Sequence, residues 1–372
     1  MIKVLFLADA LQAGGAEKAM CNLVNRLDES RFQITVKTIS HTDPNGLLSS
    51  NIAYRAINRG KTAAGRWLIH QWLRLCAWTG WIYPLYLKGD YDLEIAYLEC
   101  GPTKMLSHSD NAGAVKLAWV HCDLEKKPGI PQNRNRLRRY YEKYDKVVCV
   151  SGQVAGSVHA LFGADLPTEV LPNVVDREEI RRMAASFAPE KPKKVTFVAV
   201  GRLTTQKGFD RLIAASSILK RAGYDFSVQI LGEGEQRPLL EEMIRREGLQ
   251  DTVQLLGFLE NPYPYLWQAD ALVCSSLYEG ISTAVTEALI LGTPVITTPC
   301  AGVAELFGGR SCGVITEDNG TGIAAGMEQL LKEPSRRSLW AAEAAARGEK
   351  ISCAAAVAQT EAFFLRCLQE RK

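Results

Sequence analysis

Glu279 and Glu287 lie eight residues apart, where an apolar strand gives way to a predicted helix. Ser282 is a good N-cap for this helix, and Gly292 follows its predicted end at Leu291. At roughly 100° per residue the two carboxylates fall on related sides of the helix, whose N-terminus suits a phosphate. Carboxylates accept hydrogen bonds from hydroxyl groups, so one suits a sugar and the other a ribose. A surface charge for Glu279 and a capping role for Glu287 stay open as alternatives.

Two cations follow an earlier predicted strand. Arg202 and Lys207 lie five residues apart in the loop after residues 194–201, and a helix begins near Phe209. Such a strand, loop and helix can direct two positive charges and helix amides at one anion, and a diphosphate would suit them. Two solvated loop charges are the alternative. The loop does not match the phosphate loop of ATPases, which disfavours that class of enzyme.

Three further positions in the second half lie at strand ends. Gly201 and Gly232 each end a strand, where a residue without a side chain lets a ligand approach the backbone. Phe258 follows a third strand and would suit a nucleobase, with packing in the core as an equal alternative. None of the three is specific when taken alone.

The first half carries two candidates. Gly14 and Gly15 follow the first predicted strand and open a helix, so a phosphate or sugar can approach the backbone there. The segment is not a GxGxxG motif, which disfavours a dinucleotide. His121 ends the fifth predicted strand, and only this position distinguishes it from the other four histidines.

Short apolar runs alternate with longer segments of helical period, which predicts an α/β fold of parallel sheets flanked by helices. Two series of strands predict two Rossmann-like, doubly wound domains whose loops face a central cleft. The proline-containing segment 173–194 is the expected linker, with a boundary near 185. The expected strands span residues 3–8, 32–38, 52–57, 93–98, 115–121, 146–151, 194–201, 226–231, 252–256, 271–275, 294–297 and 313–315.

The composition narrows the class of protein. A length of 372 residues with 47% hydrophobic residues suits two domains. The net charge of +3 gives no argument for a nucleic-acid partner. Ten scattered cysteines without a CxxC pair fit neither a disulfide framework nor a zinc site, which indicates a reducing cytoplasm. The apolar run 2–8 is too short and wrongly flanked for a signal peptide.

An aromatic and basic segment covers residues 66–81. Helical spacing places Trp67, Arg74, Trp78 and Trp81 near one face, which suits an anionic membrane surface. Polar residues interrupt the segment, so it is not expected to span a membrane. Tryptophans in the core and a solvated basic helix are the alternative. A basic cluster farther along would add attraction for anionic lipid. It follows His121 and consists of Lys126, Lys127, Arg134, Arg136, Arg138, Arg139, Lys143 and Lys146.

Taken together in chain order, the candidate segments resemble those of the family-4 retaining glycosyltransferases of the GT-B fold, also called group 1 glycosyltransferases. The resemblance covers almost the whole chain. Relatives usually read Asn-Gly-Val-Asp at the crossover between domains, and Val174 replaces that glycine here. The resemblance rests on Gly14-Gly15-Ala16-Glu17, His121, Leu171-Pro172-Asn173-Val174-Val175-Asp176, Gly201-Arg202, Lys207-Gly208, and Glu279 with Glu287.

The resemblance implies a role for each site residue. Arg202 and Lys207 would clamp the donor diphosphate, and His121 would bond the transferred sugar. Glu279 would hold sugar hydroxyls and Glu287 the ribose. No metal cofactor is expected, since two cations and a helix dipole supply the positive charge. The expected catalytic residues are His121, Arg202, Lys207 and Glu279. The expected donor-binding residues are Gly14, Gly15, Gly201, Arg202, Lys207, Gly232, Phe258, Glu279, Gly280, Ile281, Ser282 and Glu287.

The resemblance also implies the division of labour along the chain. Residues 1–184 would bind the acceptor, 185–345 would bind the nucleotide sugar, and 346–372 would form a C-terminal helix with the option of crossing back to the first domain. The expected reaction moves a hexosyl or N-acetylhexosaminyl unit from a UDP-sugar to a glycan or polyprenyl-diphosphate-linked glycan during surface polysaccharide synthesis. The expected location is the cytoplasm, at the inner face of the cell membrane. A sugar-nucleotide epimerase and a non-catalytic nucleotide-sugar-binding protein stay open as alternatives.

Overall fold

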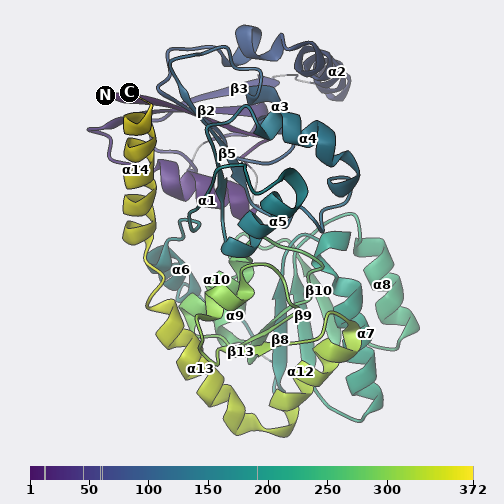
Figure 1. The fold of residues 1–372 in the computed structure, drawn as a ribbon. Helices are drawn as coiled ribbons and strands as arrows, with labels where there is room; N and C mark the ends of the chain where they lie inside the picture. Colours follow the sequence, from purple (N-terminus) through teal and green to yellow (C-terminus); the bar gives the residue numbers. More distant parts are fainter. Residues whose placement is uncertain (12–13, 45, 59, 61, 191, 372) are drawn as a thin grey trace. The chain divides into compact units, whose positions relative to one another are not determined.

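The computed structural model describes residues 1–11, 14–44, 46–58, 60, 62–190 and 192–371. They form two compact units, each a parallel sheet with helices on both faces (Figure 1). The first unit comprises Met1–Val175 with Cys353–Lys372, and the second comprises Asp176–Ser352. Both are Rossmann-like, as the sequence predicts.

The first unit contains a seven-stranded sheet in the order β3-β2-β1-β4-β5-β6-β7. The strands are β1 (Ile2–Ala8), β2 (Phe32–Ser40), β3 (Ala53–Asn58), β4 (Leu93–Ala96), β5 (Val115–Val120), β6 (Lys146–Cys149) and β7 (Thr168–Val170). The helices are α1 (Gly15–Val24), α2 (Ala63–Thr79), η1 (Tyr83–Leu87), α3 (Gly101–Leu106), η2 (Pro131–Asn133), α4 (Arg134–Tyr141), α5 (Gly152–Phe162) and α14 (Cys353–Glu370).

The central strands of this sheet are buried on both faces. All four residues of β4 are buried, as are the last five of β1. Continuous apolar runs are typical of parallel strands covered by helices on each side. The loops after β1, β4 and β5 therefore emerge together from the carboxyl edge of the sheet, because these three strands are neighbours.

The C-terminal helix α14 packs on the first unit. The Phe364 ring lies 6.4 Å from that of Phe6 and 6.2 Å from that of Phe32, both in edge-on arrangements. Arg366 forms an ion pair with Glu169 at 2.8 Å. In Figure 1 this helix, in yellow, runs beside the N-terminal strand. The expected tail 346–372 is thus divided, since residues up to Ser352 belong to the second unit.

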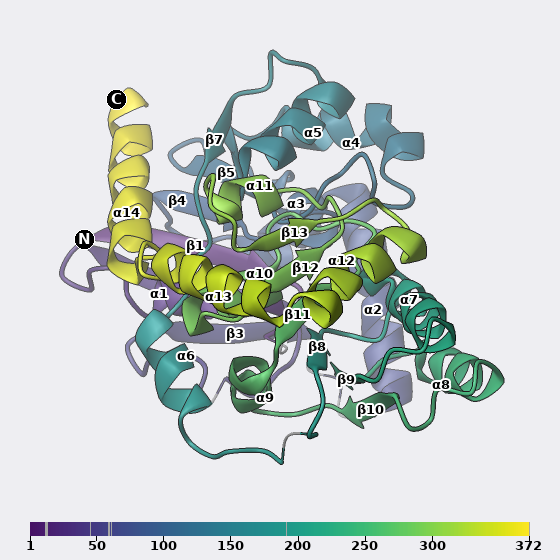
Figure 2. The same cartoon turned by 90° about the horizontal axis from the view of Figure 1, so that it is seen from below.

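The second unit contains a six-stranded sheet in the order β10-β9-β8-β11-β12-β13. The strands are β8 (Thr196–Val200), β9 (Ser227–Leu231), β10 (Val253–Gly257), β11 (Ala271–Cys274), β12 (Val295–Thr297) and β13 (Gly313–Ile315). The helices are α6 (Arg177–Ala184), η3 (Thr205–Lys207), α7 (Phe209–Arg221), α8 (Arg237–Arg246), α9 (Tyr263–Gln268), α10 (Thr283–Leu291), α11 (Val303–Phe307), α12 (Gly320–Lys332) and α13 (Pro334–Gly348). Figure 2 shows α12 beside α7, and α13 over α10.

The predicted boundary at residue 184 is wrong by nine residues, because the second unit begins at Asp176. The segment expected to be a linker contains α6, which begins where the Asp176 carboxylate accepts a hydrogen bond from the Glu179 amide at 3.1 Å. Ile180 and Ala184 are buried. The Arg181 guanidinium donates to the Ile290 carbonyl and pairs with Glu349, so α6 is fixed to the second unit.

Val174 adopts a negative φ, since Cys100 is the single non-glycine residue with a positive φ in the described part of the chain. The crossover loop therefore follows a path that does not need the family's usual glycine.

Among the described residues, no single helix is long and apolar enough to cross a membrane. Helices α13 and α14 reach the required length and apolar composition only when they are counted together, and a bend of 41° separates them.

Candidate active site

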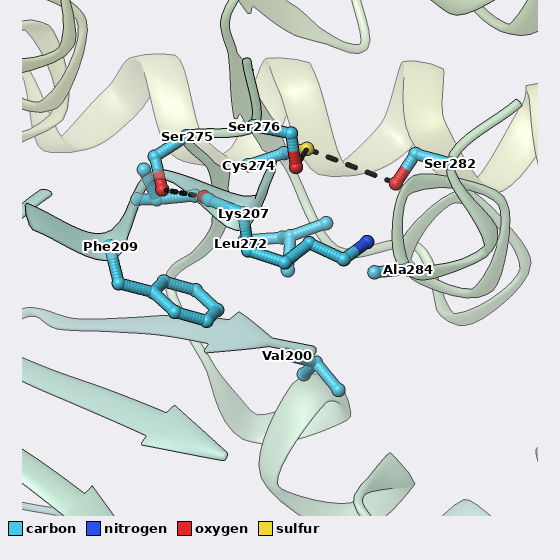
Figure 3. Close-up of a pocket in the computed structure, with 10 residues that line it drawn as sticks. Val200, Lys207, Phe209, Leu272, Cys274, Ser275, Ser276, Ser282 and Ala284 are labelled. Atoms are coloured by element: carbon cyan, nitrogen blue, oxygen red, sulfur yellow. Dashed lines mark hydrogen bonds between the residues drawn. The ribbon is translucent and has the colours of Figure 1, made fainter. Parts of the chain in front are cut away.

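The loop after β8 is held against the end of β11. Gly208 has a φ of +59°, and a β-carbon there would lie 2.3 Å from the Ser275 carbonyl oxygen. The Ser275 hydroxyl donates to the Lys207 carbonyl at 2.9 Å (Figure 3). Glycine is therefore required at 208 both for its conformation and for the close approach. This contact directs the Lys207 side chain toward the loop that precedes α10.

Lys207 and Glu279 form an ion pair, with 2.6 Å between Nζ and Oε1. The Ser276 hydroxyl donates to the same carboxylate oxygen at 2.8 Å. Burial lowers the pKa of Lys207, but the Glu279 carboxylate outweighs it and raises the pKa above its ordinary value. Lys207 is thus positively charged at neutral pH. The structure brings together two residues that the sequence assigned to different parts of a donor.

Arg202 lies in the same loop with an exposed side chain. No ion pair with it is present among the residues that the structure describes. Its charge opposes the protonation of Lys207, which indicates that the two cations are near each other. This proximity fits a pair of cations directed at one anion.

The loop glycines 201 and 232 lie against each other. A β-carbon on Gly232 would lie 1.9 Å from the Gly201 carbonyl oxygen. A β-carbon on Gly201 would lie 3.1 Å from Cε of Lys207. Both glycines therefore let the loops after β8 and β9 pack closely, and Gly201 leaves room for the lysine stem.

Helix α10 begins at the predicted N-cap. The Ser282 hydroxyl accepts a hydrogen bond from the Val285 amide at 3.4 Å, and the helix ends at Gly292 in the left-handed conformation. Gly280 and Ile281 lie just before the cap. The amides at this N-terminus, together with the helix dipole, favour an anion.

Glu287 lies in the second turn of α10, beyond the position of a capping-box residue, so that alternative is wrong. The Tyr263 hydroxyl donates to its Oε1 at 2.9 Å. Burial and the neighbouring carboxylate raise the pKa of Tyr263. The sequence did not identify Tyr263, because nothing in its spacing links α9 to α10.

A small pocket is lined by Lys207 together with residues of β11 and the start of α10. It offers about 10 Å³ to the centre of a water molecule, which is room for a single water. Figure 3 shows the Lys207 side chain extending past Leu272 toward Ala284, with the Cys274 thiol directed at Ser282. The sulfur-to-oxygen distance is 3.8 Å. The pocket is too small for a sugar, so a donor would bind outside it.

Phe258 follows β10 and is 61% exposed. The alternative that it packs in the core is therefore wrong. An exposed ring next to Gly257, whose φ is +79°, can stack on a planar ligand at this edge of the sheet.

In the first unit, Gly14 caps α1 and Gly15 is its first residue. Gly14 has no side chain with which to cap the helix, and the Glu17 carboxylate lies so close that a β-carbon on Gly14 would be 2.1 Å from its Oε2 atom. Gln12 and Ala13 belong to the same predicted loop and lie outside the described residues.

His121 follows β5, as predicted. Its ring lies 4.7 Å from that of Tyr97. Neither ring nitrogen has a hydrogen-bond partner among the described residues, and burial lowers the pKa of His121 to about 4. A neutral imidazole with unsatisfied nitrogens is suited to a hydroxyl group of a ligand.

The sequence missed Glu99, which is buried next to this histidine. Its carboxylate accepts hydrogen bonds from the His121 amide at 3.1 Å, the Cys122 thiol at 3.1 Å and the Lys127 ammonium at 2.8 Å. Glu99 follows the fourth predicted strand. The criterion that singled out His121, its place at the carboxyl end of a strand, would have found it.

The face predicted on α2 is exposed. Helix α2 ends at Thr79, and Gly80 caps it in the left-handed conformation, so the prediction that Trp81 shares the helical face is wrong. Trp67 and Trp78 on α2 and Trp81 just after it are 61%, 77% and 62% exposed, and Arg74 is exposed too. The alternative that these tryptophans pack in the core is therefore wrong. The adjacent side of the helix is exposed too. It contains Leu68, Trp72 and Leu75, which leaves a narrow buried strip of Leu73, Cys76 and Ala77.

The basic cluster on and after α4 is partly neutralised. Arg138 pairs with Glu142 and Asp165, and Lys146 pairs with Glu370. Arg136 and Arg74 are close enough to Lys104 to lower its pKa, although burial of Lys104 is the larger cause. The positive charges of Arg74, Lys104 and Arg136 therefore lie near one another and add up to a positive potential.

Comparisons with known proteins cover both units. Residues 13–179 match the model "Glycosyltransferase Family 4", and residues 181–347 match "Glycosyl transferases group 1". An uncharacterized glycosyltransferase of Methanocaldococcus jannaschii is 31% identical over 169 residues, which are 44% of this chain and 42% of that protein. The N-acetylgalactosamine-N,N'-diacetylbacillosaminyl-diphospho-undecaprenol 4-alpha-N-acetylgalactosaminyltransferase of Campylobacter jejuni is 32% identical over 58% of this chain and 59% of its own. The chain thus spans about half the length of the curated relatives it matches.

Solved structures share the fold. Anabaena Alr3699/HepE in complex with UDP and glucose has a TM-score of 0.77 at 18% identity, over 98% of this chain and 100% of its own. Sucrose-phosphate synthase from Thermosynechococcus elongatus has a TM-score of 0.80 at 16% identity over the whole of both chains. Because the two family models together match nearly the entire chain, this protein belongs to the family-4, or group 1, glycosyltransferases of the GT-B fold.

Proposed function

We propose that the protein is a retaining, metal-independent glycosyltransferase that takes a hexosyl or N-acetylhexosaminyl unit from a UDP-sugar. The observation that carries the proposal is the cationic site at the N-terminus of α10, where Lys207 is held by Glu279 and Arg202 lies nearby. Preorganised positive charge stabilises a leaving diphosphate. The UDP complex of the HepE structure, which has the same fold, supports the choice of nucleotide.

The reaction breaks the bond between the anomeric carbon and the β-phosphate oxygen of the donor. The acceptor oxygen forms the new bond to that carbon from the same face, and its proton passes to the leaving phosphate oxygen. Lys207, Arg202 and the α10 amides neutralise the charge that develops on the diphosphate. No metal is needed in this scheme, because the protein supplies the positive charge.

The remaining donor contacts follow from the site. Glu279 would accept hydrogen bonds from sugar hydroxyls, Glu287 from the ribose, and Phe258 would stack on the base. Tyr263 holds the Glu287 carboxylate by its 2.9 Å hydrogen bond. His121 would bond the transferred sugar through a ring nitrogen.

The acceptor would be a glycan or a polyprenyl-diphosphate-linked glycan in surface polysaccharide synthesis. The relative from Campylobacter jejuni, whose name describes transfer to a diphospho-undecaprenol-linked sugar, supports this class. The exposed tryptophans on α2 and just after it, with the neighbouring arginines, support binding of the protein to the anionic inner face of the cell membrane. Such an acceptor resides in that membrane.

Product analysis tests the proposal. The protein is incubated with a panel of UDP-sugars and with glycan and polyprenyl-diphosphate-linked acceptors, with and without EDTA. We expect a transferred sugar with the donor's anomeric configuration, at a rate that EDTA does not change. A changed nucleotide sugar without acceptor would support an epimerase instead. Donor binding in a thermal-shift assay without any turnover would support a binding protein.

A further inference from the structure

The buried carboxylate of Glu99 joins two loops at the carboxyl edge of the first sheet. Glu99 lies in the loop between β4 and α3, and all three of its donors lie in the loop after β5. Oε2 accepts from the His121 amide, while Oε1 accepts from the Cys122 thiol and the Lys127 ammonium. One side chain therefore fixes both ends of the segment 121–127.

We propose that Glu99 is a positioning residue that holds the loop bearing His121 and so orients the imidazole for the sugar. The inference rests on the proposed function, in which His121 contacts the transferred unit. Glu99 itself would touch no substrate, because its carboxylate oxygens are already engaged by three donors of the same loop.

The surroundings of Glu99 support this assignment. Its side chain is 8% exposed, and the next residue, Cys100, has a φ of +72°, a strained conformation for a residue with a β-carbon. Strain of this kind persists only where neighbouring contacts fix the backbone. The ring of His121 is fixed at its other side by Tyr97, which leaves its nitrogens as the part without partners.

The charge state of Glu99 depends on Lys127. Burial by itself raises the pKa of Glu99, but Lys127 and the other donors lower it to about 2. The further titratable groups that interact with Glu99 are Asp9, Cys100, His121, Cys122 and Tyr141. Removing the Lys127 charge would let Glu99 take up a proton at a higher pH. A protonated carboxyl would then accept the two remaining hydrogen bonds, from the His121 amide and the Cys122 thiol, less well than a carboxylate.

The test compares kcat of Lys127→Met with wild type across pH. We expect the ratio of the two kcat values to fall as pH falls through the raised pKa of Glu99, and to level off at a loss of about 10- to 100-fold, as expected for Glu99→Gln. The double variant E99Q/K127M has no carboxyl at position 99 to take up a proton. The ratio of its kcat to that of wild type should therefore not change with pH. The matched control is Lys88→Met, an exposed lysine of the first unit outside the basic cluster, whose ratio should stay near one. A pH-independent ratio for Lys127→Met would overturn the proposal.

A second variant separates positioning from folding. Glu99→Gln should lower kcat by about 10- to 100-fold, with a much smaller change in the donor KM, because the catalytic geometry is lost rather than the donor site. Glu125→Gln, an exposed change in the same loop, should leave both constants unchanged. A positioning role would be contradicted if Glu99→Gln and Glu125→Gln lost kcat equally, or if Glu99→Gln changed only the donor KM.

A spectroscopic readout keeps this proposal distinct from the proposed function. In protein labelled with ¹³C-histidine, the His121 resonance is assigned by its loss in His121→Gln. It should shift in Glu99→Gln and not in Glu125→Gln. An unchanged His121 resonance would overturn the positioning role even if the enzyme is active. A shifted resonance in a protein without transferase activity would leave Glu99 as the organiser of the loop and reject the proposed function.

Discussion

The Nζ atom of Lys207 lies 2.6 Å from Oε1 of Glu279, although 72 residues separate the two in the chain. The ion pair is largely buried, with side-chain exposures of 21% and 9%. A buried carboxylate keeps the lysine protonated and in one place, which is the arrangement that a preorganised anion site needs. A donor diphosphate arriving at the α10 N-terminus would meet a cation that is already oriented.

Replacing Lys207 should therefore reduce turnover strongly. We expect Lys207→Ala to lower kcat/KM for transfer by about 10²-fold or more, as for other preorganised charges at a leaving group. Lys220→Ala, at an exposed site on α7, is the matched control and should leave the rate unchanged. A near-normal rate in Lys207→Ala would remove Lys207 from the diphosphate clamp.

Replacing Glu279 should lower the free energy of unfolding more than replacing Arg202 does. Glu279→Ala leaves the Lys207 ammonium without its carboxylate, so we expect a loss of about 2–3 kcal/mol, at the lower end for a pair that retains some exposure. Arg202 is exposed, and Arg202→Ala should change the free energy of unfolding by less than about 0.5 kcal/mol. Denaturant titration measures both. Equal losses would mean that Arg202 has a structural contact as important as the ion pair.

Most of the fold follows from the sequence because buried parallel strands consist of continuous apolar runs, which can be recognised without a structure. The strand β7, Thr168–Val170, was missed because it has two half-buried residues and one exposed residue at the sheet edge and no apolar pattern. Helix α6 was missed because its segment is charged and flanked by prolines, while the two residues that bury it, Ile180 and Ala184, are too few to give a periodic signal.

The candidate site was only partly predictable. Arg202, Lys207, Glu279 and Glu287 are recognisable by spacing within a loop or helix. The sequence does not encode which charges meet, so the Lys207–Glu279 pair was not foreseen. The position of Glu99 at a strand end was visible in the sequence, but its three donors, which lie 22 to 28 residues away in another loop, were not.

The depressed pKa of His121 should appear as a pH dependence of stability. An unfolded histidine binds a proton near pH 6.5, whereas the folded His121 does so only near pH 4. Between these values the unfolded state binds more protons, so His121 should destabilise the fold as pH falls, by about 3 kcal/mol at most. This loss of stability at low pH should be absent in His121→Gln. It should remain in His41→Gln, because His41 is exposed. Parallel stability curves for wild type and His121→Gln would contradict the assigned burial.

The exposed face of α2 should bind anionic vesicles. We expect flotation with vesicles of phosphatidylcholine and phosphatidylglycerol at low salt, and weak flotation with phosphatidylcholine alone, because the neighbouring Arg74, Lys104 and Arg136 are attracted to anionic lipid. The triple variant of Trp67, Trp78 and Trp81 to Ser should lose binding at every salt concentration, since it removes the apolar contact.

A charge variant separates the two contributions to membrane binding. Arg74→Gln with Arg136→Gln should weaken binding by roughly fivefold per charge at low salt, and by less at high salt, where counter-ions screen the attraction. Trp267→Ser is the matched aromatic control, because Trp267 is 53% exposed in the second unit, away from α2 in sequence and outside the first unit. If Trp267→Ser reduced flotation as much as the α2 variant, the binding would be unspecific. If wild type ignored anionic vesicles at low salt, α2 would not be a membrane surface, and its tryptophans would require a protein partner instead.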